Sequence, residues 1–406
     1  VQYRSDDEWS VGVVDLRASA DPMAEAKAWI ADDIASADTS GARDLFATAV
    51  LRLGDEHVLW HQRYHHGIVD GFGMSIIFNE VRARYADPER RMAPAGRPEA
   101  GRSDVSAWAL EPLVVADAEY RASEGFRRDR DYWLEQMADA PEPPVLLPDV
   151  PDTGSAVTER VSVPIDRLAP LYAFAETEDV RRTRLAPAVW IAYLSAVTGR
   201  HDLVVSLPST ARVGRRARTT PFMASTILPV RLRLSPSMTV ADVARELQRA
   251  SIGAVRHGRF RGEDIARELR ESGDRMVHGP GINVLMVEHG IDIGGSPAHM
   301  HSLETGPVRD LDVTVTGGRD DEPLVFDLRS RPGAHDALIG HRDRFEWVLD
   351  QVLAQPDRAL SSLTTMSEPD LDRLLHTFND TAEPSVSTSV PALFAAQIAA
   401  TPDSVA

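Results

Sequence analysis

Tyr64-His65-His66-Gly67-Ile68-Val69-Asp70-Gly71 is the most informative segment of this sequence, with two adjacent histidines, a short spacer and an Asp-Gly pair. Residues 58–64 have the pattern of a β-strand that carries Trp60 as a large side chain. After the segment, apolar residues recur at helical spacing as far as residue 85. The sequence therefore predicts a strand, a turn and a helix, an arrangement that can hold a histidine in a fixed direction.

Asp70 and Gly71 lie where this helix is expected to begin. The first turn of a helix has free backbone N–H groups, and the helix dipole places partial positive charge there. An aspartate suits that position, and a glycine leaves space beside it. Taken alone, the segment is also compatible with a purely structural pair of histidines next to a helix cap.

A metal site is the second chemical interpretation of these histidines. His61 and His65 have a spacing that binds zinc when both lie on a helix. On a strand, the same two residues share a face but are too far apart to chelate one ion. His299 and His301 have strand spacing without further ligands nearby. We therefore expect no metal site.

Length and composition indicate a globular chain with more than one domain. The 406 residues suffice for two or three domains, and 43% hydrophobic with 26% charged residues is typical of globular proteins. We find no apolar run of membrane-spanning length and no signal peptide. The net charge of −18 disfavours nucleic acid as a partner. We expect a cytoplasmic protein with neither nucleic-acid nor membrane partners.

Two residue counts narrow the chemistry further. The sequence has no cysteine, which excludes disulfides, thiol nucleophiles and thiolate metal sites. Lys27 is the only lysine, so a Schiff-base mechanism would require that residue to lie in the site. Ser75 and Ser206 lack the sequence context of a nucleophile elbow.

The pattern His-His-x-x-x-Asp-Gly at residues 65–71 resembles the core motif of nonribosomal peptide synthetase condensation domains. Epimerization and cyclization domains and chloramphenicol-acetyltransferase-like enzymes share parts of that motif. Further segments resemble the family in the same order along the chain: Tyr120 with Asp131-Tyr132-Trp133, Leu207-Pro208-Ser209-Thr210-Ala211-Arg212, residues 221–229, and Pro280-Gly281-Ile282-Asn283-Val284. The resemblance covers nearly the whole chain.

The resemblance implies an α/β fold of two chloramphenicol-acetyltransferase-like lobes in a V, with the motif in a central tunnel. We expect an N-terminal lobe over residues 1–140, a Pro-rich connector over 141–155 and a C-terminal lobe over 156–366. Family members carry a longer stretch before the motif, so we expect the first lobe to be N-terminally incomplete.

Residue patterns in the second half predict individual elements. Apolar side chains predict a buried helix over residues 180–197, and alternation predicts a strand over 230–234. Residues 311–316 and 324–328 have the pattern of a hairpin. Leu338, His341, Phe345, Val348 and Val352 mark another helix.

Residues 367–406 resemble the linker from a condensation domain into an adenylation domain and the start of that domain. Ser367-Glu368-Pro369-Asp370 has the pattern of a capping box before a short helix. Asn379-Asp380-Thr381-Ala382, Leu393-Phe394-Ala395-Ala396-Gln397 and Thr401-Pro402-Asp403 follow in the order expected for the linker. A disordered tail with one helix is the alternative on composition.

The resemblance also assigns roles around the motif. His66, the second histidine, can accept or share a proton near neutral pH, and it acts either as a base or by positioning the attacking amine. Gly71 leaves space at the helix start, and its N–H is expected to face the developing oxyanion. His65 is expected to hold the turn.

Two distant residues complete this predicted site. In the family, the motif aspartate pairs with an arginine of the segment that ends here at Arg212, so Asp70 and Arg212 are expected to meet where the lobes join. Asn283 is a further candidate for lining the tunnel near His66. Both assignments depend on the resemblance.

The implied activity is amide bond formation between a carrier-bound acyl or aminoacyl thioester and the amine of a carrier-bound aminoacyl acceptor. Phosphopantetheine arms of upstream and downstream carrier domains would deliver both substrates, with no cofactor bound by the domain itself and an adenylation domain as its neighbour. The alternatives are an epimerization domain and a non-catalytic docking platform. The adenylation-like tail and the retained His66 and Gly71 favour condensation.

Residues 302–311 point to a subtype. Thr305-Gly306-Pro307-Val308-Arg309-Asp310-Leu311 resembles a stretch of enterobactin-synthetase-like condensation domains. The resemblance implies secondary metabolism, of the siderophore or antibiotic kind, with an aryl or acyl starter joined to an amino acid.

Overall fold

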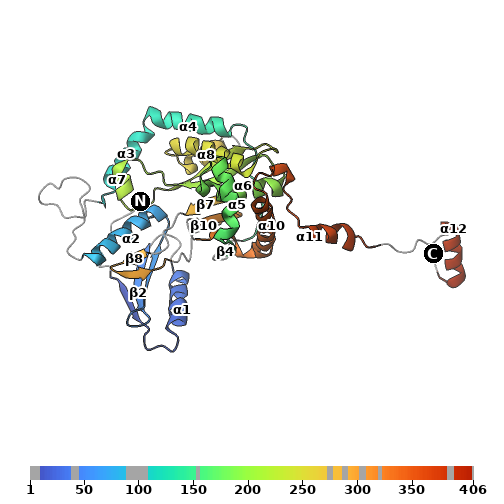
Figure 1. Ribbon diagram of the computed structural model, residues 1–406, viewed down its shortest axis with the longest axis horizontal. Coiled ribbons are helices and arrows are strands. Elements are labelled where there is room, and N and C mark those ends of the chain that lie inside the picture. The colour runs from blue at the N-terminus through green and yellow to red at the C-terminus, as the bar shows by residue number, and fades with distance from the viewer. Residues whose placement is uncertain are drawn as a thin grey trace.

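The computed structural model describes residues 10–37, 45–87, 108–151, 156–271, 278–285, 291–300, 308–318, 322–381 and 388–404. Within them the chain forms two α/β lobes and a helical tail that extends away from the second lobe (Figure 1). The described strands form a three-stranded sheet, a six-stranded sheet and a two-stranded hairpin.

The first lobe is built on the three-stranded sheet. Strand β1 (Gly12–Asp15) is parallel to β2 (Phe46–Arg52), which is antiparallel to β3 (Val58–Tyr64). Helix α1 (Pro22–Ala35) completes a small core that consists of Leu16, Ala26, Ala49, Leu51 and Leu53. The strand predicted over residues 58–64 is confirmed with the same ends.

A polar cluster ties α1 to β3. The Asp33 carboxylate lies 2.9 Å from His61 Nε2 and accepts a 2.8 Å hydrogen bond from Arg63 Nε. The hydrogen bond from Arg63 holds the pKa of Asp33 below its ordinary value, although partial burial opposes this. The ring of His61 therefore has a carboxylate partner in the fold.

Helix α2 (Gly71–Ala86) follows the motif turn and confirms the predicted helix. Its Phe78 stacks on Trp60 of β3 with ring centroids 5.9 Å apart, which fixes the helix against the sheet. Met74, Val81 and Tyr85 stay exposed to solvent. The helical spacing of these apolar residues was thus a correct signal for the helix, but not for a buried face.

The second lobe contains the six-stranded sheet in the order β4-β11-β10-β7-β5-β6. Its strands are β4 (Val157–Val163), β5 (Asp202–Ser209), β6 (Thr226–Arg233), β7 (Gly281–Leu285), β10 (Asp312–Gly317) and β11 (Leu324–Ser330). β10 and β11 pair antiparallel and confirm the predicted hairpin. Gly317 and Gly318 lead into its turn with φ of 74° and 77°, a backbone conformation that favours glycine.

Helices α5 (Ile165–Thr177), α6 (Leu185–Thr198), α8 (Val240–Arg256) and α10 (His335–Ala354) pack around the sheet and share the larger core with it. Residues 185–195 of α6 are all buried, so a buried helix is confirmed here. The predicted start at residue 180 was wrong. The Val180 N–H instead closes the end of α5 on the Ala175 carbonyl, after Asp179 has turned the chain with φ of 53°.

Helices α3 (Glu111–Arg121) and α4 (Glu124–Met137) follow the first lobe in sequence, and α4 packs on the second lobe (Figure 1). Trp133 of α4 is 2% exposed, and its Nε1 donates a 3.0 Å hydrogen bond to the carbonyl of His257. Trp133 and Met137 belong to the larger core. The domain boundary at residues 141–155 stays a prediction. By its packing, α4 belongs with the second lobe.

A two-stranded hairpin and the tail lie outside these sheets. Strands β8 (Ile291–Ile293) and β9 (Ser296–Ala298) form the hairpin, which contacts α2 of the first lobe. In the tail, Ser367 caps α11 (Glu368–Asp372) by accepting from the Asp370 N–H, as predicted. Every described residue of α12 (Val390–Ala400) is exposed. Among the described helices, none has both the length and the apolar character needed to cross a membrane.

Gly262 at the start of α9 (Gly262–Glu271) provides a test of the packing. A methyl group there would overlap the carbonyl oxygen of Ile227. We expect Gly262→Ala to lower the free energy of unfolding by about 1–3 kcal/mol, as overpacking does, measured by urea denaturation. Gly54→Ala is the control, because its nearest neighbouring atom would be 3.8 Å away. An unchanged midpoint for Gly262→Ala would contradict this packing.

Candidate active site

The turn after β3 holds one histidine and leaves the other open. The His65 N–H donates a 2.7 Å hydrogen bond to the Leu45 carbonyl, and His65 Nδ1 accepts a 3.0 Å hydrogen bond from the Gly67 N–H. The side chain of His66 is exposed and makes no hydrogen bond within the described part of the chain. The structure therefore gives His65 a place in the turn and leaves the imidazole of His66 available to a substrate.

Asp70 begins the next helix. It is the N-cap of α2, with extended backbone angles, and its Oδ1 accepts a 2.7 Å hydrogen bond from the Gly73 N–H. Its backbone carbonyl accepts from the Met74 N–H at 2.8 Å. An aspartate suits this position because it satisfies free N–H groups of the first turn and complements the helix dipole.

The same carboxylate joins the two lobes. Asp70 Oδ1 lies 2.7 Å from Arg212 Nη2, which follows β5 in the second lobe. Asp70 Oδ2 accepts 2.9 Å hydrogen bonds from the N–H groups of Ala224 and Ser225. The two charged side chains are only 3% and 2% exposed. The ion pair that the family resemblance implies is thus present and buried.

Arg212 is held by its own lobe as well. Nη1 donates to the carbonyls of Ala217 and Thr220, and Nη2 also donates to the carbonyl of Phe222 at 2.7 Å. The guanidinium carbon lies 4.5 Å from the centre of the Phe222 ring, a distance typical of cation–π contact. The guanidinium is therefore held by contacts within its own lobe as well as by the carboxylate.

Burial and hydrogen bonding act in opposite directions on Asp70. Desolvation alone would raise the pKa of the carboxyl. Hydrogen bonds from the Gly73 and Ala224 N–H groups, together with Arg212, outweigh it and hold the pKa below its ordinary value. Asp70 is therefore charged at neutral pH and acts as an anchor in this geometry, without a proton to transfer.

Gly71 and Gly73, both near Asp70, differ in the space around them. A Cβ on Gly73 would lie 2.6 Å from Val69 Cγ2 and 3.1 Å from the backbone N and O of Phe222. Gly73 thus lets the first turn of α2 touch the second lobe. A Cβ on Gly71 would have no atom of the described residues within 4 Å, and its φ does not require glycine. Gly71 therefore borders open space.

The other predicted site residues are less closely connected. Asn283 lies on β7 opposite Thr314 of β10, and no hydrogen bond or ion pair joins it to the motif turn in the described part of the chain. His299 is exposed, and His301 lies outside the described residues. Among the described residues, no group of three or more histidine, cysteine or carboxylate side chains is placed to hold a metal ion.

Sequence reasoning missed the backbone partners of the ion pair. The loop that contains Phe222, Ala224 and Ser225 was noticed only as a loose family resemblance at residues 221–229. Gly73 was not singled out. Close approach of two chain segments leaves no periodic signal, and a glycine two residues after the motif was the only trace of it.

The comparison with known families bears on this arrangement. Residues 2–375 match the family model of the condensation domain. The chain belongs to the condensation domain family. Condensation domains are the acyltransferase-type, peptide-bond-forming domains of nonribosomal peptide synthetases, so the class predicted from the motif is confirmed.

Curated relatives of this condensation domain are large synthetases. The chain is 28% identical over 398 residues to a dimodular nonribosomal peptide synthase of Bacillus subtilis (strain 168), covering 97% of the chain and 16% of that protein. It is 31% identical over 374 residues to an isonitrile lipopeptide synthase of Streptomyces coeruleorubidus, covering 88% and 24%. For enterobactin synthase component F of Escherichia coli O157:H7, identity is 27% over 401 residues, covering 97% and 30%. The chain therefore spans less than a third of each relative.

Solved condensation domains share the fold. The first condensation domain of the calcium-dependent antibiotic synthetase, in complex with a substrate analogue, superposes with a TM-score of 0.73 at 30% identity, covering 88% of this chain and 78% of that one. A variant of the starter condensation domain of rhizomide synthetase gives 0.74 at 27% identity, covering 88% and 80%. The predicted chloramphenicol-acetyltransferase-like fold is confirmed.

The buried pair yields a prediction for stability. Removing one partner leaves the other charge buried and unpaired, so we expect Asp70→Ala and Arg212→Ala each to lower the free energy of unfolding by about 3–5 kcal/mol. The double variant should lose less than the sum of the two. Urea denaturation measures both.

An exposed pair serves as the control. Arg167 Nη2 lies 2.7 Å from Asp350 Oδ1, and both side chains are about half exposed. Arg167→Ala should cost no more than about 1 kcal/mol. Additive losses for Asp70 and Arg212 would show that the two residues stabilise the fold independently.

Proposed function

We propose that this domain joins an acyl or aminoacyl thioester on one carrier domain to the amine of an aminoacyl group on another. The observation that carries the proposal is the contrast within the turn. The exposed ring of His66 has no partner among the described residues, while His65 and Asp70 on either side are fixed. A free imidazole on a rigid turn suits a reaction that requires a held amine.

The chemical step is aminolysis of a thioester. The amine nitrogen forms a bond to the thioester carbon, the carbon–sulfur bond breaks, and the donor arm leaves as a thiol after taking up a proton. His66 Nε2 or Nδ1 accepts a hydrogen bond from the amine. The ring then either removes the amine proton, a role typically worth about 10²–10⁴-fold, or holds the amine in line for attack.

Gly71 contributes at the oxyanion. Its N–H is the first of α2, at the positive end of the helix dipole, and it has no acceptor among the described atoms. Asp70 occupies the Gly73 N–H and leaves the Gly71 N–H free. We place the thioester carbonyl oxygen in the open space beside Gly71, where this N–H stabilises developing negative charge.

The partners and the setting follow from the same proposal. Phosphopantetheine arms of an upstream and a downstream carrier domain bring the two substrates, and residues 367–406 lead towards an adenylation domain. The named relatives are synthetases of which this chain covers 16% and 30%, which supports carrier and adenylation domains as partners. A cytoplasmic location is part of the same proposal. Similarity to enterobactin synthase component F and to a vanchrobactin synthetase supports the siderophore-like subtype, for which we propose an aryl or acyl donor.

His66 is tested by transfer between two loaded carriers. We expect His66→Ala to lower the rate of product formation by at least about 10²-fold while the protein stays folded, because the only free imidazole of the turn is lost. Intact-protein mass spectrometry of the acceptor carrier measures the product. Chiral analysis of the bound amino acid distinguishes condensation from epimerization.

His65 supplies the comparison. His65→Ala removes the acceptor for the Gly67 N–H and should lower stability more than it changes the chemistry of the folded fraction. Wild-type product formation by His66→Ala would overturn the proposed role. An inactive but stable His65→Ala beside an active His66→Ala would reverse the two assignments.

Gly71 and Gly73 form a matched pair of variants. Gly71→Ala places a methyl group in open space, so the unfolding free energy should change by less than about 1 kcal/mol. Product formation should fall roughly 10²-fold if the thioester carbonyl must lie there. Gly73→Ala should instead lower stability by about 1–3 kcal/mol, because its methyl group meets the Phe222 backbone. Full activity of the Gly71→Ala variant would show that the oxyanion does not lie beside Gly71.

A further inference from the structure

Helix α7 (Gly214–Thr219) carries an unpaired group of cations. Arg215 and Arg218 are exposed and Arg216 is partly buried, and their side chains make no hydrogen bond or ion pair in the described part of the chain. Most other described arginines have partners: Arg160, for example, binds Asp327. These three arginines lie within four residues of one another on a chain whose net charge is −18, and within the described part they have no acidic partner.

This helix is attached directly to the motif. Arg212 donates hydrogen bonds to the carbonyls of Ala217, in the last turn of α7, and of Thr220, just after it. The same guanidinium binds Asp70, the cap of α2. Ala217 itself is buried. Helix α7 is therefore linked through Arg212 to the N-cap of α2, and it lies between α3 and α2 in the view of Figure 1.

The chemistry of the cluster suits a compact anion of high charge. Residues three apart on a helix share a face, so Arg215 and Arg218 point to the same side. A guanidinium presents two parallel N–H donors that match phosphate oxygens. No carboxylate among the described residues pairs with these three cations, and a bound phosphate would offset their mutual repulsion.

We propose that the α7 cluster, Arg215, Arg216 and Arg218, binds the phosphate of the phosphopantetheine arm of one of the two carriers. The inference depends on the proposed function, because only that function brings such an arm to this site. The arm must reach His66, and its phosphate is the charged group that travels with the substrate. A small cluster on one short helix fits a single phosphate better than a broad acidic protein surface, which needs contacts over hundreds of square ångströms.

The test compares two substrates that differ only in this phosphate. Acyl and aminoacyl thioesters of pantetheine and of 4′-phosphopantetheine are offered as donor and as acceptor, and kcat/KM is measured for each. In the wild type we expect the phosphate to raise kcat/KM roughly ten-fold or more for one of the two substrates, as charge-assisted hydrogen bonds do. In the triple variant Arg215→Ala, Arg216→Ala, Arg218→Ala that ratio should fall towards one.

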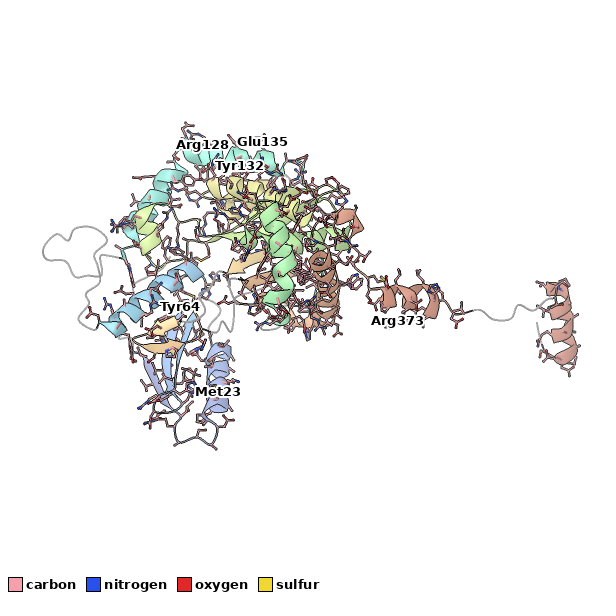
Figure 2. The ribbon with its side chains drawn as sticks, viewed as in Figure 1. Met23, Tyr64, Arg128, Tyr132, Glu135 and Arg373 are labelled. Atoms are coloured by element: carbon pink, nitrogen blue, oxygen red, sulfur yellow. The ribbon has the colours of Figure 1, made fainter. Side chains whose placement is uncertain are left out.

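Arg128→Ala is the matched control. Arg128 is exposed on α4 at the outer edge of the second lobe (Figure 2) and has no ion pair within the described chain. The Arg128→Ala substitution removes one surface cation at a site away from α7. The variant should keep the wild-type ratio of kcat/KM with and without the phosphate. A triple variant that keeps the ratio, or a wild type without phosphate preference, would overturn the inference.

A binding measurement separates this inference from the proposed function. Calorimetry with unreactive pantetheine and 4′-phosphopantetheine needs no turnover, and the phosphate should lower Kd in the wild type but not in the triple variant. If no substrate gives an amide product but the phosphate still lowers Kd in the wild type only, the proposed function is wrong and the phosphate site stands. If the triple variant loses affinity for carriers with and without the arm alike, the cluster binds acidic protein surface and the phosphate assignment is wrong.

Discussion

The buried contact between the Asp70 carboxylate and the Arg212 guanidinium is the constraint on which the arrangement of this domain depends. One charge comes from each lobe, and both side chains are buried. Either charge without its partner would carry an uncompensated desolvation cost. Each is surrounded by backbone groups of fixed direction: N–H groups of residues 73, 224 and 225 for the carboxylate, and carbonyls of residues 217, 220 and 222 for the guanidinium. These directional contacts favour the one arrangement of the two lobes that the structure shows.

This contact also positions the motif turn, residues 65–70. Asp70 ends the turn that begins at His65, so fixing Asp70 against the second lobe fixes the direction of the chain through His66. On the other side, β3 is held through the stacking of Trp60 on Phe78 and through the polar cluster of Asp33 and His61. The imidazole of His66 is exposed to solvent, and its position is set by its neighbours in sequence, which make the hydrogen bonds and the ion pair.

Much of this arrangement could be predicted from the sequence. Local signals were enough for the strand at residues 58–64, the hairpin around Gly317 and the cap at Ser367, because alternation, glycine pairs and capping residues act over a few positions. The partnership of Asp70 with Arg212 needed the family resemblance, since 142 residues separate the two. The contact of Gly73 with Phe222 and the packing of α4 on the second lobe were not predicted. Both depend on how surfaces meet in three dimensions, and neither has a periodic pattern.

The close contact between Gly73 and the Phe222 backbone affects how lobes can be exchanged between synthetases. The first turn of α2 touches the main chain of the opposite lobe, with no side chain between them to adapt to a new neighbour. A hybrid that grafts one lobe onto a relative's other lobe would therefore have to carry residues 69–73 and 212–225 together as a matched pair. A junction inside either stretch would misalign the halves, however well each half folds by itself.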